Sequence, residues 1–126
     1  MERRTFLIGA AAVSAIATPA FAADGPSARY GLIGKMKAVP GQRDALIAAI
    51  LEGSASMPGC LSYIVAKDAD DADAIWITEV WDSEASHDAS LQLPAVQASI
   101  AKAKDMVAAV ETGVVTTPVG GIGLKA

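Results

Sequence analysis

The chain contains few of the residue types on which many functional sites are built. It has one cysteine, one histidine, two tryptophans, two tyrosines and two phenylalanines among 126 residues. A single histidine excludes a histidine-rich metal site, and a single cysteine excludes an intrachain disulfide. The 10 basic residues form no cluster and the net charge is −4, so nucleic acid and anionic membrane surfaces are poor partners.

The lone thiol, Cys60, has two interpretations. It can be a small apolar residue at the start of a strand, or a reactive thiol that attacks a substrate or bridges two chains. A reactive thiol needs a neighbouring histidine or cation that lowers its pKa, and the residues beside Cys60 include neither. The sequence therefore favours a structural role for Cys60.

Long hydrophobic runs are absent after the first two dozen residues, so no transmembrane helix is expected there. Residues 1–22 hold the pair Arg3-Arg4, an apolar run over residues 8–16 and a small-residue pattern at 20–22. These features predict a cleaved signal peptide that resembles a twin-arginine export signal. We expect cleavage after Ala22, export by the twin-arginine or the general secretion route, and a periplasmic or secreted protein.

Removal of this segment leaves a chain of single-domain length, which we place at residues 23–119, followed by a flexible glycine-rich tail over 120–126. β-Rich segments predict strands over residues 30–37, 60–66, 74–81 and 111–119. Helical periodicity predicts a helix over 42–56 and a second one that begins after Asp82 or Ser83 and is interrupted at Leu93-Pro94. The second helix then continues with an apolar stripe at Val96, Ile100, Ala103 and Val107.

The order β-α-β-β-α-β predicts an α+β, ferredoxin-like fold with both helices on one face of the sheet. In the third strand, alternation separates two sets of side chains. One set is Trp76, Thr78 and Val80, and the other is Ile75, Ile77, Glu79 and Trp81. Because neither set is polar and the helices cover one face only, the second face needs a partner surface, and we expect a homodimer.

Four aspartates at positions 68, 70, 71 and 73 occupy the loop between the second and third strands. Their spacing raises the alternative of a calcium site. An EF-hand also requires a glycine at loop position six and a distal bidentate glutamate, and the loop has neither. The sequence therefore favours a solvated turn.

The segment that carries most chemistry runs from the third strand to the only histidine. Trp81 and Glu79 share one face of that strand, and His87 follows in the first turns of the next helix. This arrangement predicts a pocket wall with His87 as a donor or base, against the alternatives of a surface histidine and tryptophans that serve only core packing. Glu79 is either catalytic or paired with a cation across the dimer. A Ser-His-Asp triad is disfavoured because no G-x-S-x-G motif is present.

The same segment resembles a known family. EVWDSEA at residues 79–85, followed by Leu91, Pro94 and Val96, resembles the E-x-W-x-S-x-E-A…P core of the antibiotic biosynthesis monooxygenase superfamily, including its quinol-monooxygenase-like members. VPGQR at residues 39–43 and PGCLSY at residues 58–63 resemble two further segments of that family. The resemblance covers roughly residues 30–119.

The resemblance implies a dimeric α+β barrel that oxygenates phenols, anthrones or quinols with O₂ and without metal, flavin or another cofactor. It implies His87 and Trp81 as catalytic residues and Tyr63, Glu79 and Ser90 as substrate-binding residues. Many members carry a histidine nine residues after the motif tryptophan; here that position is Ser90, and His87 comes six residues after Trp81. Two alternatives stay open: a non-catalytic small-molecule-binding or stress-response protein of the same fold, and haem binding with His87 as axial ligand.

Overall fold

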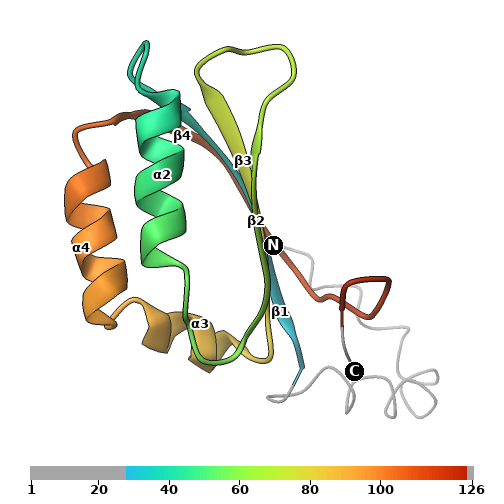
Figure 1. Cartoon of the computed structure of the whole chain (residues 1–126). Coiled ribbons are helices and arrows are strands. Elements are labelled where there is room, and N and C mark those ends of the chain that lie inside the picture. Colours follow the sequence, from blue (N-terminus) through green and yellow to red (C-terminus); the bar gives the residue numbers. More distant parts are fainter. Residues whose placement is uncertain (1–27, 125–126) are drawn as a thin grey trace, which may run out of the picture.

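The computed structural model describes residues 28–124, so the predicted signal peptide lies outside the described residues. Within them the elements follow one another as β1 (Tyr30–Ala38), α2 (Arg43–Gly53), β2 (Cys60–Lys67), β3 (Ala74–Trp81), α3 (Glu84–Ser90), α4 (Pro94–Ala103) and β4 (Val107–Thr116) (Figure 1). The predicted β-α-β-β-α-β order is confirmed, with the second helical region divided in two. No helix in this part of the chain is long and apolar enough to cross a membrane.

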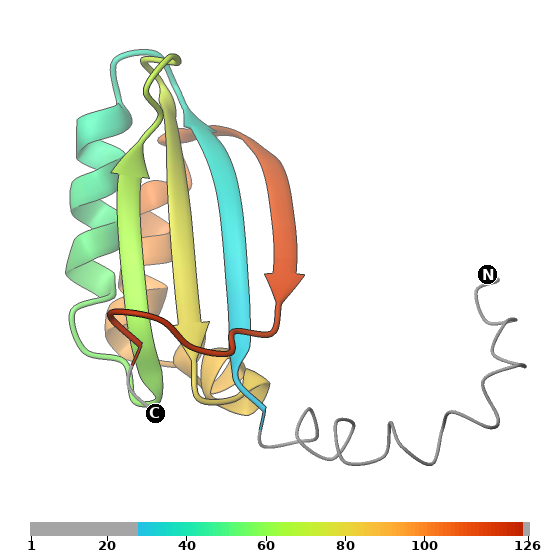
Figure 2. The same cartoon turned by 90° about the vertical axis from the view of Figure 1, so that its right-hand side faces the viewer.

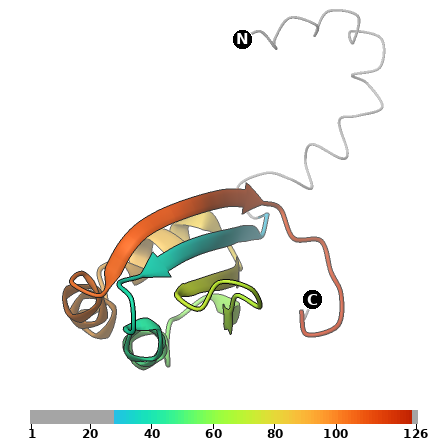
Figure 3. The same cartoon turned by 90° about the horizontal axis from the view of Figure 1, so that it is seen from above.

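The four strands form one antiparallel sheet in the order β2-β3-β1-β4 (Figure 2). This order places β1 and β3 at the centre and makes β1 and β2 parallel to each other through the intervening β3. All the helices lie on one face of the curved sheet (Figure 3). The α+β, ferredoxin-like fold predicted from the sequence is therefore confirmed.

The two longer helices, α2 and α4, touch each other at a point where both carry small residues. Leu46, Ala49 and Gly53 form the buried stripe of α2, as its periodicity predicts. A side chain at Gly53 would collide with Ser99 of α4, and the Ser99 hydroxyl donates a hydrogen bond to the Ala49 carbonyl over 2.7 Å. The glycine therefore allows the helices to approach closely enough for this bond to form.

The division between α3 and α4 follows local signals. Ser83 is the N-cap of α3, and its hydroxyl accepts a hydrogen bond from the Ser86 amide over 3.1 Å, which satisfies one of the free donors at the helix start. Pro94 occupies the first turn of α4, where its missing N–H group costs nothing. Both features agree with the predicted interruption at Leu93-Pro94.

The predicted position of the last strand, residues 111–119, is wrong by about one helical turn. The strand begins at Val107, which the periodicity had assigned to the helical stripe, and it ends at Thr116. The Met106 amide donates to the Ala103 carbonyl over 2.8 Å and closes a turn, while the Val39 amide donates to the Met106 carbonyl over 2.8 Å. Contact with β1 therefore ends the helix early, and an apolar stripe on its own does not contain that information.

The aspartate-rich loop between β2 and β3 uses its carboxylates to hold itself together. Asp68 accepts hydrogen bonds from the indole N–H of Trp76 and from the amides of Asp70 and Asp71, over 2.8 to 2.9 Å. The bond from Trp76, followed by the two amide bonds, lowers the pKa of Asp68 to about 2. The described residues hold no group of three or more His, Cys, Asp or Glu that could bind a metal ion. These bonds favour the predicted turn over a calcium site.

Candidate functional site

A cavity of about 330 Å³ lies between the sheet and the helices. Apolar side chains from β1, β3, α2 and α4 supply most of its wall, and its volume falls in the range of small-molecule sites. All five residues that the sequence singled out line this cavity: Tyr63, Glu79, Trp81, His87 and Ser90. The fold thus brings these side chains together, and their roles in catalysis and binding stay predictions.

A hydrogen bond joins Trp81 and Glu79, whose side chains lie on the same face of β3. Trp81 is 1% exposed, and its indole N–H donates a hydrogen bond to Glu79 Oε1 over 2.8 Å. Residues two apart on a strand point to the same face, which explains why the sequence could group these two. The other carboxylate oxygen of Glu79 accepts no hydrogen bond from residues 28–124. Among the residues that the structure describes, the partner of Glu79 is therefore an indole and not a cation.

His87 is held between two aromatic rings. Its ring centroid lies 5.2 Å from that of Tyr30 and 5.5 Å from that of Trp81, the latter in an edge-on arrangement. His87 Nδ1 lies 3.1 Å from a carboxylate oxygen of Asp88, and the histidine side chain is 17% exposed. These contacts orient the imidazole at the end of the cavity where β3 meets α3.

Ser90 lies one turn after His87, on the same side of α3. It is 4% exposed, and its hydroxyl donates to the His87 carbonyl over 2.6 Å. The hydroxyl proton of Ser90 is therefore engaged in a hydrogen bond to the helix backbone, while its oxygen can still accept a hydrogen bond in the cavity. The positions six and nine residues after Trp81 face one cavity because they are three residues apart on a helix.

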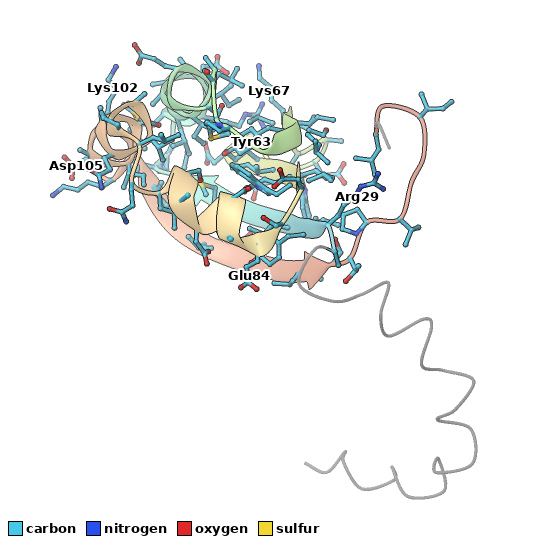
Figure 4. The ribbon with its side chains drawn as sticks, turned by 90° about the horizontal axis from the view of Figure 1, so that it is seen from below. Arg29, Tyr63, Lys67, Glu84, Lys102 and Asp105 are labelled. Atoms are coloured by element: carbon cyan, nitrogen blue, oxygen red, sulfur yellow. The ribbon has the colours of Figure 1, made fainter. Side chains whose placement is uncertain are left out.

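Tyr63 provides a polar group with no hydrogen-bonding partner among residues 28–124. It lies directly opposite Glu79 in the β2–β3 ladder, and Figure 4 shows it between the helices and the sheet, whereas Lys67, Lys102 and Asp105 lie at the outside. Its hydroxyl makes no hydrogen bond to any described residue. Burial raises the pKa of Tyr63 well above its usual value, with a smaller contribution from the charge of Glu79. The hydroxyl therefore stays protonated and can donate a hydrogen bond to a ligand.

Sequence reasoning missed one charged residue of the cavity, Lys104. It follows the last turn of α4 and lines the cavity together with Val96 and Ile100. The signal was present, because residues 96, 100 and 104 are spaced four apart and so share one face of a helix. The stripe predicted from the sequence contains Val96, Ile100 and Ala103 but not Lys104.

Cys60 is not among the residues that line the cavity. It begins β2, as predicted, and it is half-buried. Burial raises the pKa of its thiol, against a smaller opposite effect of a contact with the Ser62 carbonyl. A raised thiol pKa reduces the amount of the nucleophilic thiolate at neutral pH, which agrees with a structural role.

The comparison with protein families decides the identity of this fold. The family model described as antibiotic biosynthesis monooxygenase matches residues 29–102. The chain belongs to this family. Membership supports a monooxygenase-type function, and it leaves the substrate undetermined because members of one fold family can act on different molecules.

Solved structures agree with this assignment. A candidate antibiotic biosynthesis monooxygenase of Chloroflexus aurantiacus J-10-fl is 63% identical, with a TM-score of 0.76, over 77% of this chain and 99% of the other. A candidate monooxygenase of the same name from Caulobacter crescentus CB15 is 16% identical, with a TM-score of 0.68, over 75% of this chain and 93% of the other. At that identity the likeness shows the fold alone. Comparison with curated proteins gave no match.

The unpartnered hydroxyl of Tyr63 leads to a prediction about stability. A buried polar group without a partner destabilises a folded protein, so Tyr63→Phe should raise the free energy of unfolding of the ligand-free protein by about 0.5–1 kcal/mol. Urea titration followed by circular dichroism measures this change.

Tyr30→Phe is the matched control, since it also removes a phenol hydroxyl but leaves the ring contact with His87 in place. We expect the control to change the free energy of unfolding by less than about 0.5 kcal/mol. A loss of more than 1 kcal/mol in Tyr63→Phe would mean that its hydroxyl already has a stabilising partner.

Proposed function

We propose that this protein is a monooxygenase that oxidises a quinol- or phenol-like aromatic compound with O₂. The observation that carries the proposal is the apolar cavity of a monooxygenase-family chain, in which a protonated Tyr63 hydroxyl and the free oxygen of Glu79 lie on neighbouring strands. Apolar walls suit an aromatic ring, and one donor beside one acceptor suits the hydroxyl group on that ring.

The proposed reaction is balanced without an external reductant. A hydroquinone and O₂ give a hydroxyquinone and water: one ring C–H bond is replaced by a bond to oxygen, and the second oxygen atom leaves as water. The substrate supplies all the electrons, because its ring ends at the quinone level. The part left to the protein is to enclose the ring and to assist loss of the first proton from the substrate hydroxyl.

The side chains of the cavity can assist loss of this first proton. The free oxygen of Glu79 can accept the substrate proton, while the Tyr63 hydroxyl donates a hydrogen bond to the phenolate oxygen that forms. Trp81 holds the Glu79 carboxylate in place through its other oxygen. His87 lines this end of the cavity in contact with the Trp81 ring, and an imidazole can exchange a proton with a substrate or product bound beside it.

Oxygen consumption with a panel of hydroquinones tests the proposal. We expect the wild-type protein to exceed autoxidation, and Glu79→Gln to lower kcat by about 10² because the proton acceptor is lost. Trp81→Phe should also lower the rate, since it removes the bond that orients Glu79. His87→Ala removes the imidazole and keeps Glu79, so its rate of oxygen consumption measures the role of the imidazole separately.

Trp76→Phe is the matched control, because Trp76 lies on the same strand but faces away from the cavity and bonds to Asp68. Its rate should stay within about twofold of the wild type. Uptake equal to that of the protein-free control across the whole panel would contradict the proposal and favour the non-catalytic binding protein. A Soret shift with haemin that His87→Ala abolishes would favour the haem-binding alternative.

We also propose a homodimer in which two sheets pack face to face. The face of the sheet opposite the helices carries apolar side chains that are well exposed in the single chain: Ile33 is 37% exposed, Ile64 57% and Val114 48%. These three residues lie on β1, β2 and β4, three of the four strands that lie side by side in the sheet (Figure 2). Exposed apolar side chains gathered on one face of a sheet favour association.

Light scattering coupled to size exclusion measures the mass in solution. We expect the mass of two chains for the wild type, and at least a tenfold weaker dimer for Ile64→Lys, which places a charge in the contact. Leu51→Lys is the matched control, since Leu51 is 49% exposed on α2 and lies on the other side of the molecule. A wild-type mass of one chain at micromolar concentration would contradict the dimer.

We propose further that the protein is exported and acts in the periplasm or outside the cell. The paired arginines, the short apolar run and the small residues at positions 20–22 support this proposal. N-terminal sequencing of protein from the periplasmic fraction should begin at Ala23, and an intact N-terminus in the cytoplasmic fraction would contradict export.

A further inference from the structure

The cavity is elongated along helix α4. Leu91, before the helix, and Lys104, after it, both line the cavity, as do Val96 and Ile100 between them. At a rise of 1.5 Å per residue, the path from the start of α4 to Lys104 is roughly 15 Å long. An elongated cavity of this kind, called the channel below, suits an extended ligand better than a compact one.

The strand residues that line the cavity indicate a similar length for it. Glu79 lies near the end of β3, beside α3, whereas the lining residue Met36 pairs with Ile75 and Val110 near the other end of the sheet. Four residues of a strand separate Ile75 from Glu79, which corresponds to about 13 Å. Val107, the start of β4, lines the cavity at that far end and follows Lys104 by three residues.

The two ends of the cavity carry opposite charge. Among the described residues that line it, the carboxylate belongs to Glu79 at the α3 end and the ammonium group to Lys104 at the far end. The wall between them is apolar and includes Ile50, Ile77 and Ile100. A ligand that fills the channel therefore meets a hydroxyl-binding group at one end and a cation at the other.

Lys104 differs from the neighbouring lysine of the same helix. Lys102 forms an ion pair with Glu52 over 2.8 Å on the outer surface. Lys104 forms no ion pair with any residue in the described part of the chain, although Asp105 follows it directly. Its ammonium group is therefore available to a ligand, and the methylene groups of its side chain can lie along the apolar wall.

From this arrangement we infer that the substrate is an aromatic quinol or phenol that carries a carboxylate or another anionic group on a short side chain of the ring. The hydroxyl lies at Tyr63 and Glu79, the ring lies against the apolar wall, and the anionic group pairs with Lys104. The inference deepens the proposed function and rests on it for the position of the hydroxyl. Lys104 thus determines specificity and takes no part in the oxidation.

Equilibrium binding in the absence of O₂ tests this inference without any turnover. The probes are 3-(2,5-dihydroxyphenyl)propionate and its uncharged isostere 3-(2,5-dihydroxyphenyl)propionamide, each titrated by calorimetry at low salt. We expect the wild-type protein to bind the propionate about fivefold more tightly than the propionamide, as is typical of one exposed charge pair. This preference should weaken as salt is added.

Lys104→Gln should abolish the preference by weakening binding of the propionate alone, and Lys104→Arg should retain it. Lys102→Gln is the matched control and should behave as the wild type does. Equal binding of the two probes by the wild type, or a preference that survives in Lys104→Gln, would overturn the inference while leaving the proposed oxidation of a quinol intact. Failure of both probes to bind at millimolar concentration would contradict the inference and the proposed function together.

Discussion

The hydrogen bond from Trp81 to Glu79 is the interaction on which the site depends. It joins one of the largest fully buried side chains among the described residues to a carboxylate that lines a mostly apolar cavity. A carboxylate in such surroundings is stable only with a hydrogen-bonding partner. The indole N–H supplies that partner and occupies one oxygen only, so the second oxygen is left for a substrate. One bond therefore stabilises the core and orients the carboxylate that we propose as the proton acceptor.

The positions of the helices follow from small residues and in turn create the cavity. Gly53 and Ser99 let α2 and α4 meet closely, and both of these residues also line the cavity. The helices pack against each other and against the sheet around Leu46 and Ile77, but the space beside Trp81 and along α4 is not filled by large side chains. A protein interior is normally close-packed, so an unfilled space lined by polar groups at its ends indicates a binding site.

Much of the fold could be predicted from local patterns. The alternation of β3 predicted its limits and separated Trp76 from Trp81, and Ser83 and Pro94 marked the starts of the two later helices. The start of β4 could not be predicted, because Val107 fits the apolar spacing of a helix and that of a strand equally well. The hydrogen bond between Val39 and Met106 decided between them, and it joins segments far apart in the sequence.

The motifs at residues 39–43, 58–63 and 79–85 indicated the family from the sequence alone. Short-range periodicity predicted the order of elements and grouped residues around Trp81, because it places neighbours on a common face. Tertiary structure alone decided that Tyr63 has no hydrogen-bonding partner among residues 28–124 and that Lys104 stands at the opposite end of the same cavity. Each of these facts concerns distances between separate elements. Such distances result from packing, on which a linear pattern carries little information.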